Sequence, residues 1–79
     1  ELAVFKAVND SSSVYCEEKD SGTTETNALT EARNEFINVL SEELDVSTAY
    51  INSSFGEAEW AGYWQLFNYF AMSECPEYY

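Results

Sequence analysis

The sequence predicts a small α+β domain in which an N-terminal β-hairpin packs on two α-helices. Residues 2–19 hold two short runs of β-forming residues separated by turn formers. Two later stretches, 28–44 and 57–72, repeat apolar residues at the three- and four-residue spacing of a helix. A chain of 79 residues can build one hydrophobic core, so residues 1–79 are expected to form a single domain.

The hairpin is expected within residues 2–19. Residues 2–8 (LAVFKAV) and 13–19 (SVYCEEK) are the candidate strands, and residues 9–12 (NDSS) between them are turn formers. A hairpin alone is marginally stable in water, so one of its faces must pack on a helix or pair with another strand. Residues 20–27, which are rich in Ser, Thr and Gly, are expected to form the loop that follows.

Two helices are expected after this loop. In residues 28–44 the apolar positions lie on one face and acids on the other, as in an amphipathic helix. The helix at 57–72 begins with Glu57, ends before Pro76 and has aromatic residues on every face. A domain this small cannot easily bury all sides of such a helix, so Tyr63, Phe70 and residues 78–79 are candidates for an exposed partner-binding stripe. A well-packed core helix is the alternative.

Residues 40–55 (LSEELDVSTAYINSSF) allow two interpretations. They resemble the helix-turn-helix of repressor proteins, with a first helix ending at Leu44 and Ile51 facing inward. They depart from that motif at Asp45, where Gly is usual, and at Ser41, where Ala is usual. The alternation in residues 46–52 suits equally a third strand added to the hairpin, and we favour this strand at 46–55. Because the stretch lacks Lys and Arg, no direct binding to nucleic acid is expected.

Charge is the most informative feature for function. The chain has fifteen acidic and three basic residues, which gives a formal net charge of −12, and the segment from Asn34 to Tyr79 contains no Lys or Arg. Such a field repels phosphate backbones and attracts cationic surfaces, so the expected partner is a basic protein, most plausibly a nucleic-acid-binding one. The acids also keep an aromatic-rich domain in solution, which is the simpler explanation of their number.

Catalysis and cofactor binding are not expected. The chain has no His, which removes the commonest general base, and neither Cys has an activating partner nearby in the sequence. It contains no phosphate-binding Gly-rich loop and no EF-hand spacing. Two Cys without His cannot supply a four-ligand zinc site. We therefore expect a non-enzymatic protein without cofactor or metal.

The two cysteines, Cys16 and Cys75, are either bridged or free. A disulfide between them would close a long loop and indicate an oxidising compartment. The sequons Asn9-Asp10-Ser11 and Asn52-Ser53-Ser54 and the absence of an initial Met agree weakly with secretion. No stretch reaches the ~20 apolar residues of a membrane span, so no membrane contact is expected.

In size, acidity and scarcity of basic residues the chain resembles the small phage-encoded DNA-mimic and anti-CRISPR proteins. The resemblance is one of type and involves no alignable motif. It implies an inhibitor, or decoy, in the cytoplasm of a bacterial or phage host, which blocks a basic nucleic-acid-binding surface. The alternatives are a secreted, disulfide-bridged binding module and an immunity protein or antitoxin that neutralises a cationic toxin. The sequence leaves the oligomeric state open. The candidate contact residues are seven acids and two aromatic residues: Glu31, Glu35, Glu42, Glu43, Asp45, Glu57, Glu59, Tyr63 and Phe70.

Overall fold

The structure, a computed structural model, describes residues 2–79, and all regular structure in this range is helical. Helices α1 (Leu2–Asp20), α2 (Glu25–Leu44), α3 (Thr48–Ser54) and α4 (Glu57–Glu74) are followed by a short 3-10 helix, η1 (Pro76–Tyr78). The predicted α+β class is therefore wrong. Neither the hairpin at 2–19 nor the third strand at 46–55 forms, whereas the two helices predicted at 28–44 and 57–72 are present and somewhat longer.

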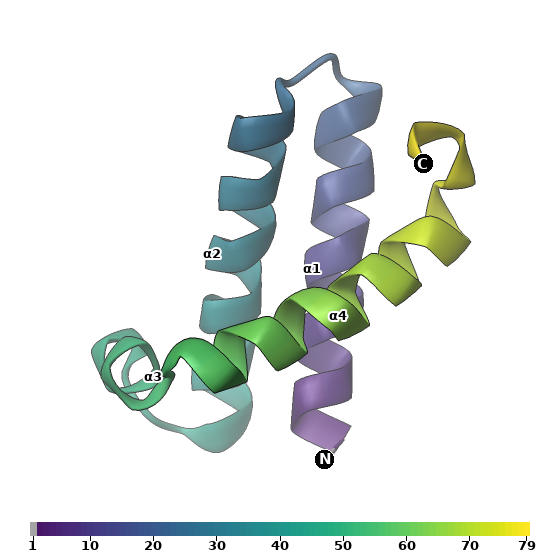
Figure 1. The fold of residues 1–79 in the computed structure, drawn as a ribbon. Helices are drawn as coiled ribbons and strands as arrows, with labels where there is room; N and C mark the ends of the chain where they lie inside the picture. The colour runs from purple at the N-terminus through teal and green to yellow at the C-terminus, as the bar shows by residue number, and fades with distance from the viewer. Residues whose placement is uncertain (1) are drawn as a thin grey trace.

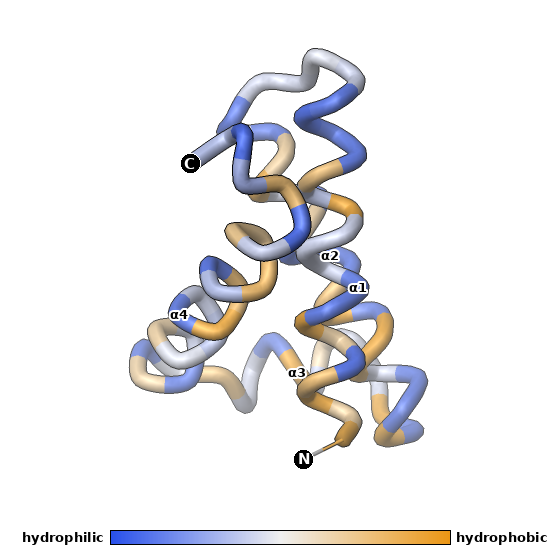
Figure 2. The backbone as a smooth tube through the Cα atoms, turned by 90° about the vertical axis from the view of Figure 1, so that its right-hand side faces the viewer, coloured by the Kyte–Doolittle hydropathy of each residue, from blue (hydrophilic) through white to orange (hydrophobic). Residues whose placement is uncertain are grey.

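The helices form two layers. Helices α1 and α2 run antiparallel side by side, and α4 crosses both of them diagonally (Figure 1). A quarter turn of the view shows α4 as a separate layer beside this pair, at the left of the picture (Figure 2). The C-terminus lies beside the end of α1, and α3 lies at the end of α2. The hydrophobic core fills the space between the α1–α2 pair and α4.

Helix α1 forms where the hairpin was expected because its buried residues follow helical rather than strand spacing. Ala7, Val8, Ser11, Ser12 and Tyr15 recur at one-, three- and four-residue steps and are all buried. The two serines, which signal a turn when considered locally, have hydrogen-bonded hydroxyls inside the helix pair. Ser12 Oγ donates to the Asn9 carbonyl of its own helix, at 2.9 Å. Burial against α2 thus overrides the local turn preference.

The connection between α2 and α3 has the order helix, turn, helix. Asp45 ends α2 in the left-handed region, at φ 56°, which is the conformation that usually calls for Gly at this point. Its N–H and that of Val46 donate to the last carbonyls of α2. Ser47 then caps α3, since its side chain accepts a hydrogen bond from Tyr50 N at 3.1 Å. The backbone of Asp45 and the side chain of Ser47 therefore cap two helices in a segment whose alternation favoured a strand.

Helices α2 and α4 begin at defined caps. Thr24 accepts a hydrogen bond from Asn27 N at 3.3 Å and starts α2 within the segment that was predicted as loop. At the start of α4, Gly56 N donates to Glu59 Oε1 at 2.9 Å. The acids in these first turns also complement the positive end of the helix dipole.

A buried hydrogen-bond network joins all three long helices. Ser11 Oγ of α1 donates to the Ala32 carbonyl of α2 at 2.7 Å, and the Tyr63 hydroxyl of α4 lies 2.6 Å from the same oxygen. Because the serine proton is used toward Ala32, the tyrosine hydroxyl donates to Ser11 Oγ. Burial raises the pKa of Tyr63 to about 12. The network fixes the register of the three helices at the centre of the core.

A disulfide between Cys16 and Cys75 joins α1 to the end of α4. Both cysteines are buried, and their Cα atoms lie 5.9 Å apart. Two side-chain hydrogen bonds tie the same region: Ser13 Oγ donates to Glu74 Oε1 at 3.0 Å, and the Tyr78 hydroxyl donates to Asp20. The bond to Asp20 is the main cause of the rise in the pKa of Tyr78 to about 12. The C-terminal part of the chain is thereby fastened to α1.

Candidate functional site

Three of the candidate acids form a row along one side of α2. Glu31, Glu35 and Glu42 are separated by four and seven residues, so helical geometry places them within about 40° of one another around the axis. The row spans eleven residues, or about 16 Å of helix. Glu31 and Glu42 are exposed, and Glu35 is half-buried. We call these three residues the acidic row.

The acidic row faces away from α4. Arg33 lies two residues from Glu31, which places it about 160° away on the opposite side of α2. Its guanidinium stacks on the Trp60 ring of α4, 4.4 Å from the ring centroid. The one cation within the helix therefore points toward α4, and the acidic row is left without a cation of its own helix beside it.

Glu43 lies off the acidic row, about 120° from Glu31 around the axis of α2. The pKa of Lys6 in α1 is raised, chiefly by its hydrogen bond and charge interaction with Asp10, and to a smaller extent by Glu43 and Glu42. Lys6 Nζ lies 3.1 Å from Asp10 Oδ2. The acids at the end of α2 thus lie near the start of α1, where this lysine offsets part of their field.

The other candidate acids have local structural tasks. Asp45 is exposed and occupies the left-handed position that ends α2. Glu59 caps α4 through Gly56 N, and Glu57 lies in the first turn of the same helix. The nine candidate residues therefore do not form one surface. The acids of α2 and those of α4 lie on different helices, and the capping tasks fall on Asp45 and Glu59 rather than on the acidic row.

The two aromatic candidates differ in exposure. Tyr63 is 4% exposed and belongs to the central hydrogen-bond network, so it offers no surface to a partner in this structure. Phe70 is half-buried against the core. The exposed apolar side chains of α4 are instead Tyr69, at 65%, and Met72, at 49%. The sequence predicted an exposed stripe on this helix, but the crossing angle of α4 selects different residues.

All three basic residues of the chain are engaged internally. Lys6 pairs with Asp10, and Lys19 Nζ lies 2.9 Å from Glu25 Oε1. The hydrogen bond from Lys19 is the largest cause of the lowered pKa of the Glu25 carboxyl. Arg33 stacks on Trp60. The outer surface therefore presents an excess of carboxylates that the chain itself does not neutralise.

The described residues offer no metal centre and no membrane-spanning helix. Within residues 2–79, no three Cys, Asp or Glu side chains gather closely enough to hold a metal ion. None of the helices in this range combines the length and the apolar character needed to cross a bilayer. Comparisons with protein-family models, curated proteins and solved structures found no match for this chain.

Proposed function

We propose that this protein is a non-enzymatic inhibitor that occupies the basic, nucleic-acid-binding surface of a partner protein. The observation that carries the proposal is the acidic row of α2. It presents three carboxylates over about 16 Å of one rigid helix, on the side opposite Arg33. Carboxylates held at fixed positions can replace phosphates in a basic groove, and the net charge of −12 speeds the encounter with such a groove.

The disulfide indicates the compartment in which the proposed inhibitor acts. Buried bridges persist in oxidising compartments and are rare in the cytosol, where thiols are kept reduced. The bridge between Cys16 and Cys75 therefore favours the secreted alternative over the cytoplasmic location inferred from the resemblance to phage proteins. We accordingly include in the proposal a secreted, disulfide-braced form of the protein, whose cationic partner is met outside the cytosol.

The test compares two triple variants with the same change in net charge. In the first, Glu31, Glu35 and Glu42 of the acidic row are changed to Gln. In the second, the matched control, three exposed acids outside the candidate set are changed to Gln: Glu17, Glu74 and Glu77. Both variants lose three negative charges, and Gln preserves the size of each side chain. Any difference in partner binding between the two variants therefore reflects the positions of the removed charges and not their number.

The wild type and both variants are immobilised as bait and incubated with host extracts and with the secreted fraction. Bound proteins are washed with rising salt and then challenged with competing DNA. We expect a basic protein to be retained and to be displaced by DNA. It should bind the row variant about three- to hundredfold more weakly than the control, since each exposed charge pair contributes roughly 0.2–1 kcal/mol. Equal losses for the two variants would show simple ion exchange. Retention that DNA does not displace would contradict the nucleic-acid-decoy proposal.

The location is tested separately by intact mass. Protein from its native source, measured with and without reductant, is expected to gain the mass of two hydrogens on reduction. Two free thiols in the native material would remove the secreted form from the proposal and leave the cytoplasmic one.

A further inference from the structure

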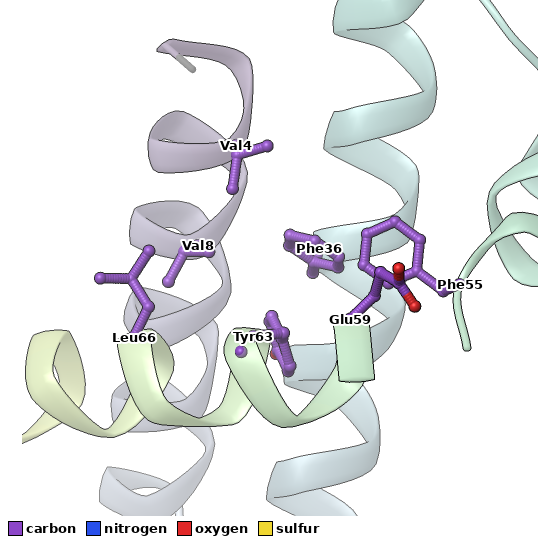
Figure 3. A pocket seen from close by; sticks show the side chains of 8 residues that line it. Val4, Val8, Phe36, Phe55, Glu59, Tyr63 and Leu66 are labelled. Atoms are coloured by element: carbon purple, nitrogen blue, oxygen red, sulfur yellow. The ribbon is translucent and has the colours of Figure 1, made fainter. Parts of the chain in front are cut away.

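A pocket of about 210 Å³ opens between the first half of α1, the second half of α2 and the first half of α4. Figure 3 shows its two ends. Val4, Val8 and Leu66 form one end, and the side chains of Phe36, Phe55 and Glu59 form the other, with Tyr63 between them. The surface of the pocket is almost entirely apolar, and Glu59 places its charge at the rim of one end.

The aromatic end is tightly built. The Phe36 ring lies 4.4 Å from the Tyr63 ring and 5.7 Å from the Phe55 ring, measured between centroids. The Tyr63 hydroxyl is bonded to Ser11, so the part of Tyr63 that lines the pocket is its ring. Glu59 uses Oε1 to cap Gly56 and retains Oε2 for another partner. Aromatic rings beside a carboxylate are the surroundings that favour an organic cation.

The size of the pocket limits the ligand. A cavity of roughly 150 Å³ is enough for benzene, whereas drug-sized ligands need roughly 300–1,000 Å³. Glu59 and Leu66 are seven residues apart, so the two ends lie about 10 Å apart along α4. These dimensions suit a short alkyl chain or a single ring with a charged group at one end.

Gly62 of α4 borders the pocket and has open space at its side-chain position. It lies in the helix interior, where Gly is disfavoured, and it lines the pocket. A Cβ built at this position would have no atom within 4 Å, so neither close packing nor an unusual backbone angle requires the glycine. Any side chain at Gly62 would project into space that is now open. The sequence shows a single Gly within an aromatic-rich helix, but only the fold shows that this Gly borders a pocket.

We propose that this pocket binds a small amphiphilic ammonium compound, with its cationic nitrogen at the rim beside Glu59 and Phe55 and its apolar tail inside the pocket toward Val4, Val8 and Leu66. Charge complementarity selects this class. None of the pocket-lining residues is basic, and the chain carries a net charge of −12, so an anionic amphiphile is repelled. The proposal does not depend on the acidic row or on the partner inferred from it.

The probe is n-hexyltrimethylammonium, titrated by calorimetry and followed by tryptophan emission. Trp60 reports on the pocket because its ring lies 4.9 Å from Phe55 and 5.9 Å from Phe36, measured between centroids. Three matched probes separate the contributions: hexanoate has the tail with the opposite charge, 1-hexanol has the tail alone, and tetramethylammonium has the charge alone. We expect saturable one-to-one binding for n-hexyltrimethylammonium, and binding at least tenfold weaker for each of the other three.

Two variants and their controls test the position. Glu59→Gln removes the charge but leaves an amide oxygen to cap Gly56, and Glu57→Gln is its control on the same helix. Gly62→Leu fills the pocket, and Ala61→Leu adds the same side chain at the next, exposed position. We expect about tenfold weaker binding for Glu59→Gln, loss of binding for Gly62→Leu, and affinities within about twofold of wild type for the controls. The far-ultraviolet circular dichroism of every variant verifies its helix content.

Several outcomes would overturn the proposal. Absence of binding to the wild type would do so directly. Equal binding of hexanoate would show a purely apolar site, and equal effects of Glu59→Gln and Glu57→Gln would show adsorption to the acidic surface in general. Undiminished binding to a folded Gly62→Leu variant would place the ligand elsewhere. Binding of a lysine-rich aromatic peptide without binding of the ammonium probe would identify a protein-docking pocket instead.

Discussion

Removal of the Cys16–Cys75 disulfide is expected to destabilise the protein severely. The bridge joins residues 59 positions apart. In the chain-entropy treatment, a loop of this length restricts the unfolded chain by about 14 cal/mol/K, which corresponds to about 4 kcal/mol at 25 °C. A domain of 79 residues has a total free energy of unfolding of roughly 4–12 kcal/mol. The bridge therefore accounts for a large fraction of the stability.

The assay is thermal and guanidinium unfolding of the wild type and of the double variant Cys16→Ala/Cys75→Ala, followed by circular dichroism. For a domain of this size, each kcal/mol shifts Tm by about 4–8 °C, so a loss of about 4 kcal/mol lowers Tm by roughly 15–30 °C. Reduction of the wild type serves as a second route to the same state. Because both cysteines are buried, reduction is expected to need partial unfolding and to be slow under native conditions.

Hydrogen exchange locates the effect. The C-terminal half of α4 and η1 are held on α1 by the bridge, by the hydrogen bonds of Ser13 and Tyr78, and by the packing of Phe67 on Tyr15. In the double variant we expect the amides of residues 69–79 to lose protection first, while the paired helices α1 and α2 retain more. A Tm within a few degrees of the wild-type value, or uniform loss of protection, would refute the reasoning that the bridge restrains a long loop and fastens this end of the chain.

Three further predictions concern single residues. Gly62→Ala is expected to stabilise the protein by about 0.5–1 kcal/mol, because the helix interior favours Ala and a Cβ at this position contacts no other atom. Gly22→Ala is expected to destabilise the protein, because Gly22 has a φ of +88°. Guanidinium unfolding measures both changes in the free energy of unfolding. Ser11→Ala is expected to cost about 1–3 kcal/mol, because it leaves the buried Tyr63 hydroxyl without its acceptor; an unchanged unfolding midpoint would show that the network does not contribute. Burial raises the pKa of Tyr63 to about 12 from its ordinary value of 10.0, so the stability that its protonated hydroxyl contributes is complete below pH 10 and is lost as the pH rises toward 12. Because the pKa of Tyr78 is raised as well, Tyr63→Phe should reduce the alkaline decline of Tm without abolishing it, and an unaltered profile of Tm against pH would contradict the assignment.

The two later helices could be predicted from the sequence because their signals are local. The apolar residues of 28–44 recur at helical spacing, and Glu57 and Pro76 delimit the helix between them. The first helix could not be recognised in the same way. Its residues 9–12 are turn formers in isolation, and only the close approach of α2 provides the Ala32 carbonyl that satisfies Ser11. Tertiary contacts there outweigh local propensity.

The candidate site was predicted in part. Net charge and the lack of basic residues follow from composition, and the acidic row follows from spacing along a correctly predicted helix. The direction in which each side chain points could not be predicted from composition or spacing. Tyr63 is buried rather than exposed, and Glu59 and Asp45 turn out to cap helices, because the diagonal crossing of α4 and the turn at Asp45 decide which sides of the helices face the core.

The sequence by itself determined the charge, the exclusion of histidine-based chemistry, two of the helices and the pair of cysteines available for a bridge. The tertiary structure alone decided that residues 2–20 form a helix, that Cys16 meets Cys75, and that Gly62 opens onto a pocket bordered by Glu59. The physical reason is the range of the interactions. Charge and helical periodicity are properties of neighbouring residues, whereas burial, bridging and pocket formation depend on residues that only folding brings together.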